Sequence, residues 1–139
     1  MSNYVSIITP VEYRIDEIAT LLKASLNARK MYQDFSEHIV IDSSPENVSK
    51  SLAQLCVIYQ AKYYHTTNRN VRYKRNLGVS KSEGELLLFL DSDVEPIPDI
   101  ILQHINSLLV DSPGTFGIVE FVGNSTIWND IMESSSHVE

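Results

Sequence analysis

Apolar and polar positions alternate in blocks along most of the chain. Runs rich in β-branched and aromatic residues predict strands at residues 4–9, 37–41, 61–66 and 86–90, with a fifth near residues 116–122. Short runs bounded by polar or turn-forming residues are typical of strands rather than of long buried helices. The pattern therefore predicts a sheet of short strands.

The segments between these runs carry apolar residues at the spacing of amphipathic helices. We expect one helix over residues 15–28 and a second from a serine cap at Ser43 to about Tyr59. A third helix is expected over residues 70–81, with a break near Gly78. A fourth should begin at Pro98 and direct these apolar residues inward: Ile100, Ile101, Ile105, Leu108 and Leu109. Strands that alternate with helices favour an α/β fold with a parallel sheet covered on both faces. Ligands of such sheets bind at the carboxyl ends of the strands.

Composition and charge narrow the class of protein. The chain has 139 residues, enough for one domain with a core, and its net charge of −7 argues against nucleic acid as a partner. The single Cys56 excludes an internal disulfide, and no histidine or cysteine spacing suggests zinc. No apolar run is long enough for a membrane span, and Met1 leads almost directly into a strand. We expect a cytoplasmic domain, membrane-peripheral where a longer parent protein anchors it.

Polar residues follow the predicted strands where a ligand would bind. They are the turn at residues 10–14, Asp42, and the Asp91-Ser92-Asp93 segment. On an extended backbone Asp91 and Asp93 project to one side, roughly 7 Å apart. One carboxylate then suits a divalent cation such as Mg²⁺, and the other suits a sugar hydroxyl. The alternative is that both are solvated turn residues.

Three stretches together resemble the family 2 glycosyltransferases, which have the GT-A fold. They are V-S-I-I-T-P, I-V-I-D-S-S and K-R-N-L-G-V-S-K-S-E-G-E-L-L-L-F-L-D-S-D, and residues 75–93 are the most specific part because order and spacing agree over a long window. The chain departs from the family pattern at Ser43, where a second Asp is frequent, and at Lys74, where Ala is usual. The resemblance implies a Rossmann-like GT-A fold with a mostly parallel sheet, here incomplete.

The resemblance also implies a site. The nucleobase pocket would be lined by Pro10, Val11, Glu12 and Tyr13, and Asp42 would hydrogen-bond the base, commonly uracil. Arg75 would hold the nucleotide, and Asp91 would lie near the ribose. The metal would be bound by Asp91 and Asp93. The implied partners are a nucleoside-diphosphate sugar, expected to be UDP-linked, a divalent cation (Mg²⁺ or Mn²⁺) and an acceptor of unknown type. The implied reaction is inverting transfer of the sugar to an acceptor hydroxyl, helped by a carboxylate base.

The length of the chain leaves alternatives open. We expect a nucleotide-sugar-binding domain over residues 1–123, followed by a polar tail, 124–139, that is either disordered or the start of an acceptor-binding half. Nothing marks Glu120 or Glu133 as the base, so no catalytic residue is named. The chain is therefore an enzyme domain too short to act alone, or a non-catalytic nucleotide-binding fragment or degenerate relative. Uncovered apolar surface would favour self-association.

A phosphatase is the weaker alternative. The L-F-L-D-S-D-V segment also resembles the strand end of haloacid-dehalogenase-type phosphatases, in which the first Asp would be a nucleophile. Those enzymes place this motif near the start of their core and need further acids and a Lys downstream. Here the motif begins at Asp91, so too little chain follows it.

Overall fold

The computed structural model describes residues 3–108, 114, 115 and 117. Residue contacts divide the chain into two units, residues 1–102 and 103–139. The elements, in chain order, are β1 (Val5–Val11), α1 (Ile15–Tyr32), β2 (Ser36–Asp42), α2 (Glu46–Ile58), β3 (Lys62–His65), α3 (Val71–Lys81), β4 (Leu86–Phe89) and α4 (Ile100–Ser107). The first unit contains the sheet and the first three helices, whereas α4 crosses the boundary between the units.

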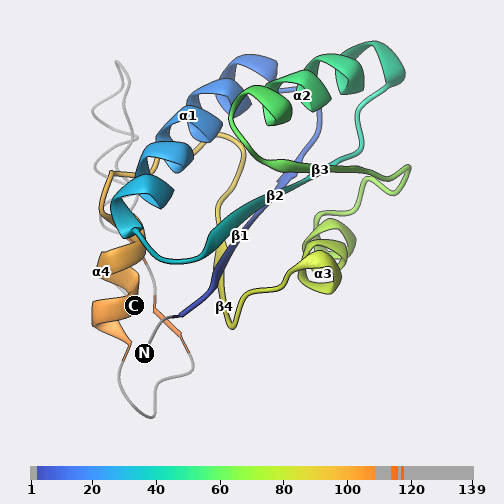
Figure 1. Cartoon of the computed structure of the whole chain (residues 1–139). Helices are drawn as coiled ribbons and strands as arrows, with labels where there is room; N and C mark the ends of the chain where they lie inside the picture. The colour runs from blue at the N-terminus through green and yellow to red at the C-terminus, as the bar shows by residue number, and fades with distance from the viewer. Residues whose placement is uncertain (1–2, 109–113, 116, 118–139) are drawn as a thin grey trace, which may run out of the picture. The chain divides into compact units, whose positions relative to one another are not determined.

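The sheet of the first unit is parallel and has the strand order β3-β2-β1-β4 (Figure 1). The central pair is in register from Val5 opposite Ser36 to Val11 opposite Asp42, and both strands are almost completely buried. Continuous burial explains why their sequences are apolar runs rather than alternating patterns. The carboxyl ends of these strands meet at one edge of the sheet, as predicted.

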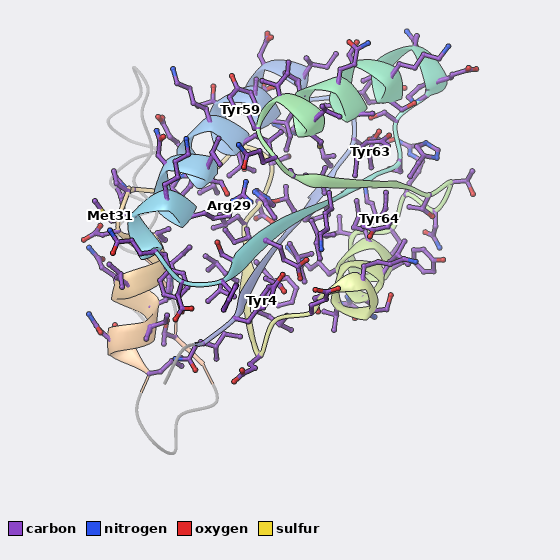
Figure 2. The ribbon with its side chains drawn as sticks, viewed as in Figure 1. Tyr4, Arg29, Met31, Tyr59, Tyr63 and Tyr64 are labelled. Atoms are coloured by element: carbon purple, nitrogen blue, oxygen red, sulfur yellow. The ribbon has the colours of Figure 1, made fainter. Side chains whose placement is uncertain are left out.

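Helices cover both faces of this sheet. Figure 1 shows α1 and α2 on one face and α3 on the other, so the predicted α/β/α layering is confirmed. Arg29 of α1 joins the two helices of the first layer, because its guanidinium donates to the carbonyl oxygens of Tyr59 (2.9 Å) and Gln60 (3.1 Å) at the end of α2 (Figure 2). Those carbonyls would otherwise lack a helical partner.

The predicted break near Gly78 is wrong, because α3 continues without interruption from Val71 to Lys81. The glycine has a packing role instead. A β-carbon at Gly78 would lie 2.4 Å from Cγ2 of the buried Ile8 on β1. The missing side chain therefore lets α3 lie directly on the sheet, which places the amino-terminal half of the helix near the strand ends.

A buried histidine joins the central strands to α1. His38 of β2 is completely buried, and its ring nitrogens are hydrogen-bonded to the hydroxyl groups of Thr9 (2.8 Å) and Ser25 (2.7 Å). Burial, with a smaller effect of the nearby Arg29 charge, lowers the pKa of His38 to about 3. The ring is therefore a neutral core residue at physiological pH.

Two details differ from the sequence-based expectation. Helix α2 begins at Glu46 after Pro45, without a side-chain cap, because the hydroxyl groups of Ser43 and Ser44 bond to other elements. Strand β4, expected to be buried, is instead half-buried, and its Leu87 and Phe89 are 41% and 45% exposed. It is the edge strand of the described sheet, and α3 packs on β1 and β2.

The last predictions concern the carboxyl-terminal part. Helix α4 begins at Ile100, two residues after Pro98, and Ile101 is buried as expected. The predicted strand near residues 116–122, the inward Leu109 and the polar tail lie outside the described residues, apart from Gly117. Among the described helices, none is long and apolar enough to cross a membrane.

Candidate functional site

A cavity of about 390 Å³ opens at the carboxyl ends of β1, β2 and β3. Its lining comes from the last residue of β3, the first residue of α2 and the segments that follow the three strands: Glu12, Tyr13, Ser43, Ser44, Pro45, Glu46, His65, Thr67 and Arg69. Small-molecule sites commonly have volumes of roughly 300–1,000 Å³ and combine apolar walls with a few fixed polar groups. The cavity has the size and the position in the sheet that a ligand site requires.

The turn after β1 forms one wall of the cavity. Tyr13 has a left-handed backbone (φ 67°), which its amide stabilises by donating to the Ser44 hydroxyl oxygen at 2.7 Å. The ring of Tyr13 is half exposed. Glu12 pairs with Arg69, whose Nε lies 2.6 Å from the carboxylate. A non-glycine residue held at positive φ by its surroundings is frequent at binding sites.

Asp42 is the last residue of β2 and directly precedes Ser43 and Ser44 of the cavity lining. Its side chain is completely buried, and its two oxygens accept hydrogen bonds from the Ser44 amide (2.8 Å) and the Tyr63 hydroxyl (2.6 Å). Burial and the bond to Asp42 raise the pKa of Tyr63, so its hydroxyl stays protonated. Figure 2 shows Tyr63 and Tyr64 on opposite sides of β3, with Tyr63 toward α2. In this arrangement Asp42 fixes the loop at residues 43 and 44.

Consecutive residues of α3 reach the two halves of the strand-end edge. Lys74 is 2% exposed, and its ammonium donates to the carbonyl oxygen of Val11 (3.1 Å) and to the hydroxyl oxygen of Ser43 (2.9 Å). Arg75 points toward β4, where its Nη2 lies 3.0 Å from a carboxylate oxygen of Asp91. Helix α3 therefore connects the cavity beside β2 with the acidic turn after β4.

The Asp91-Ser92-Asp93 segment is a turn, as in the alternative stated above, so the spacing expected for an extended backbone does not apply. The amide of Val94 donates to the carbonyl oxygen of Asp91 at 3.2 Å, and this bond closes the turn. The Asp91 side chain is 61% exposed and is held by Arg75. Asp93 is exposed as well, and none of the described side chains is paired with it.

These carboxylates meet the requirements of a magnesium-type ion but not of a protein-enclosed metal centre. The described part of the chain contains no cluster of three or more histidine, cysteine, aspartate or glutamate residues able to hold a metal. Mg²⁺ commonly binds one or two carboxylates and completes its coordination with water and substrate phosphates. An open turn with one carboxylate unpaired and another fixed by an arginine fits that mode.

The predicted site residues lie at one edge of the sheet, but they differ in burial and in the groups they contact. Glu12 and Tyr13 line the cavity, whereas Pro10, Val11 and Asp42 are buried and do not line it. Arg75 and Asp91 form an ion pair beside Asp93, on the other side of β1. The residues that were not predicted include Ser43, Ser44 and Arg69, which line the cavity, and Lys74, which donates to Ser43. Ser43 and Ser44 follow the buried end of β2, and that position alone was a usable signal.

A sequence profile of glycosyl transferase family 2 matches residues 6–130 of the chain. The chain belongs to this family. The match includes every strand of the described sheet and both halves of the strand-end site. In this family 2 domain the acidic turn follows the fourth strand, which removes the phosphatase alternative with its motif near the start of the core.

The curated relatives are much longer than this chain. An uncharacterized glycosyltransferase of Rickettsia bellii is 33% identical over 89 residues, which are 64% of this chain but 13% of the relative. A second, from Rickettsia conorii, is 32% identical over 89 residues, or 14% of its own length. The family 2 domain therefore corresponds to a small part of each relative.

Solved structures show the GT-A fold. A mannosyltransferase from Pyrobaculum calidifontis, in complex with GDP-Man and Mn²⁺, has a TM-score of 0.66 at 18% identity. The match covers 81% of this chain and 34% of that one. Glucosyl-3-phosphoglycerate synthase from Mycobacterium tuberculosis, in complex with Mn²⁺, UDP and glucosyl-3-phosphoglycerate, has a TM-score of 0.57 at 17% identity and is covered to 40%. At these identities the likeness concerns the fold.

Proposed function

We propose that this domain binds the nucleoside diphosphate part of a sugar donor along the strand-end edge. The single observation that carries the proposal is that α3 joins the cavity of about 390 Å³ beside β2 to an acidic turn after β4 through the adjacent residues Lys74 and Arg75. A nucleotide needs such an extended site, because its base and its diphosphate are different chemical groups several ångströms apart.

The base occupies the cavity in this proposal. The half-exposed ring of Tyr13 offers a flat apolar surface, and Arg69 and Glu12 form a polar rim. The sequence predicts that Asp42 contacts the base, but in this proposal Ser43 makes that contact instead, because Asp42 is completely buried and Ser43 lines the cavity. Asp42 then acts indirectly, by fixing the backbone of the loop that carries the two serines.

The diphosphate lies by the acidic turn in this proposal. Asp93, with its unpaired carboxylate, would hold the divalent cation, and Asp91 would stay oriented by Arg75 toward the ribose or the same cation. The Nε of Arg75 is buried and has no hydrogen-bond partner among the described residues. When bound, a divalent cation supplies positive charge against the charge that develops on the leaving diphosphate.

In the complete protein we propose inverting transfer to an acceptor hydroxyl. The acceptor oxygen bonds to the anomeric carbon, the bond from that carbon to the diphosphate oxygen breaks, and the hydroxyl proton passes to a base. The acceptor and the base are expected in residues outside this chain, since it spans about an eighth of its curated relatives. The runner-up is a domain that binds the nucleotide without turnover.

Ligand-dependent thermal stability tests the binding proposal. Addition of UDP with Mn²⁺ at about 100 times the dissociation constant should stabilise the domain by about 2.7 kcal/mol, seen as a raised Tm. The gain should require the metal and disappear in an Asp93→Ala variant, whereas an Asp99→Ala variant, which changes a nearby acid outside the turn, should retain it. No Tm shift with any nucleoside diphosphate would refute the proposal. Release of UDP from a UDP-sugar by the isolated chain would overturn the expectation that the base lies elsewhere.

A further inference from the structure

A buried lysine, Lys74, is hydrogen-bonded to Ser43 in the lining of the candidate base cavity. The Lys74 side chain is 2% exposed, although a lysine is rarely buried unless its charge is compensated. Burial lowers its pKa, and the carboxylates of Glu12 and Asp42 oppose that effect by stabilising the charged form. Lys74 therefore places an ammonium group between the ends of β1 and β2.

The ammonium determines the direction of the hydrogen bond that Ser43 makes. An ammonium group only donates hydrogen bonds, so the Ser43 oxygen must accept at 2.9 Å. The serine hydroxyl hydrogen is then left to donate to another acceptor. No side chain or carbonyl of the described residues accepts it, and Ser43 lines the cavity. Ser43 is thus prepared to donate to a ligand.

Ser44, the next residue of the cavity lining, also has a hydroxyl group that is free to donate. The Ser44 oxygen accepts from the Tyr13 amide at 2.7 Å, so its hydroxyl hydrogen is also left over. The two carboxylates of the lining, Glu12 and Glu46, are each paired with a cation, Arg69 and Lys50. The hydroxyl groups of Ser43 and Ser44 are therefore both left as donors at this part of the cavity lining.

We propose that Lys74 and Ser43 act as a specificity pair that selects a carbonyl over an amino group on the edge of the base. This inference rests on the proposed function, because it assigns a base preference to the same cavity. Uracil presents a carbonyl at ring position 4, and cytosine presents an amino group there. A donor facing the amino group leaves both groups without a partner, whereas a donor facing the carbonyl forms a hydrogen bond.

Binding of UDP and CDP tests the pair, because the two nucleotides share the ribose and the diphosphate. We expect the full chain, titrated with each nucleotide in the presence of Mg²⁺ by calorimetry, to bind UDP about tenfold more tightly than CDP. The Ser43→Ala variant should bring the ratio close to one, and Ser43→Thr, which retains the hydroxyl, should preserve it. Ser80→Ala, on the exposed face of α3, is the control and should leave the ratio unchanged.

Lys74→Met separates selection from simple support of the fold. Without the ammonium the Ser43 hydroxyl can rotate and accept from an amino group, so the ratio should fall even where UDP still binds. If circular dichroism shows that this variant does not fold, the Ser43 series decides the matter alone. A wild-type ratio near one, or a full ratio in Ser43→Ala, would overturn the specificity pair while leaving nucleotide binding intact. Failure of the wild-type chain to bind either nucleotide would instead overturn both proposals.

Discussion

Lowering the pH should destabilise this domain through one core residue, His38. Its ring is completely buried between the hydroxyl groups of Thr9 and Ser25, and its pKa is lowered to about 3. In the unfolded chain the same ring has a pKa of about 6.5. Because the unfolded state binds the proton more readily, stability is fully present above the unfolded pKa and is lost as the pH falls toward the folded one.

The size of the effect follows from the difference in pKa. Each pH unit below the unfolded pKa costs about 1.4 kcal/mol while the folded ring stays neutral. At pH 4.5, two units below the unfolded value, the loss attributable to His38 is about 3 kcal/mol. That is a large share of the 5–15 kcal/mol, roughly, by which small domains are stable.

Urea unfolding at pH 7 and pH 4.5 measures this loss, and a His38→Gln variant isolates it. Glutamine can hydrogen-bond both hydroxyl groups but does not titrate in this range. The wild-type chain should lose about 3 kcal/mol more stability than the variant between the two pH values, because the carboxylates contribute equally to both. Equal losses in the two chains would refute the assignment of His38 as a neutral buried ring.

Three other changes have defined outcomes. Gly78→Ala should destabilise the domain by about 1–3 kcal/mol, because the clash with Ile8 outweighs a helix-propensity gain of about 1 kcal/mol. In an Ile8→Ala background most of this loss should disappear. Net stabilisation by Gly78→Ala in denaturant unfolding would contradict the close approach of α3 to β1. Arg29→Leu should lower the free energy of unfolding by about 1–3 kcal/mol, since the carbonyls of Tyr59 and Gln60, just after α2, lose their donor. An unchanged urea midpoint would count against that role. Cys56 should react with a thiol reagent only when the domain unfolds, because burial raises its pKa to about 12; rapid labelling of the native chain at pH 8 would show otherwise.

Periodicity predicted the layered fold well because burial alone determines it. The central strands β1 and β2 are buried on both faces, so their apolar runs are unmistakable. Strand β4 is equally apolar in sequence but lies at the edge of the described sheet, and no pattern along one strand reveals its position in the sheet. Gly78 misled for a related reason, since local propensity favours a break where a tertiary contact requires a glycine.

The candidate site was predictable in position but not in detail. Strand-end logic placed the acidic turn and the region around Asp42 at one edge. Which group lines the cavity depends on side-chain contacts between distant segments, and these contacts bury Asp42 and turn Ser43 toward the cavity. The link from Lys74 to Val11 and Ser43 spans more than thirty residues of chain, so the residue pattern along α3 alone could not predict it.

The central claim is that a nucleoside diphosphate and a divalent cation bind together along this edge. Nuclear magnetic resonance of the isotopically labelled chain tests it most directly, first with UDP and Mg²⁺ and then with UDP and a trace of paramagnetic Mn²⁺. We predict that UDP shifts the amide signals of Tyr13, Ser43 and Ser44, and that Mn²⁺ broadens those of Ser92 and Asp93 most strongly. Shifts confined to the separate hollow lined by Lys23 and Glu95, or no change with UDP and metal, would contradict the account.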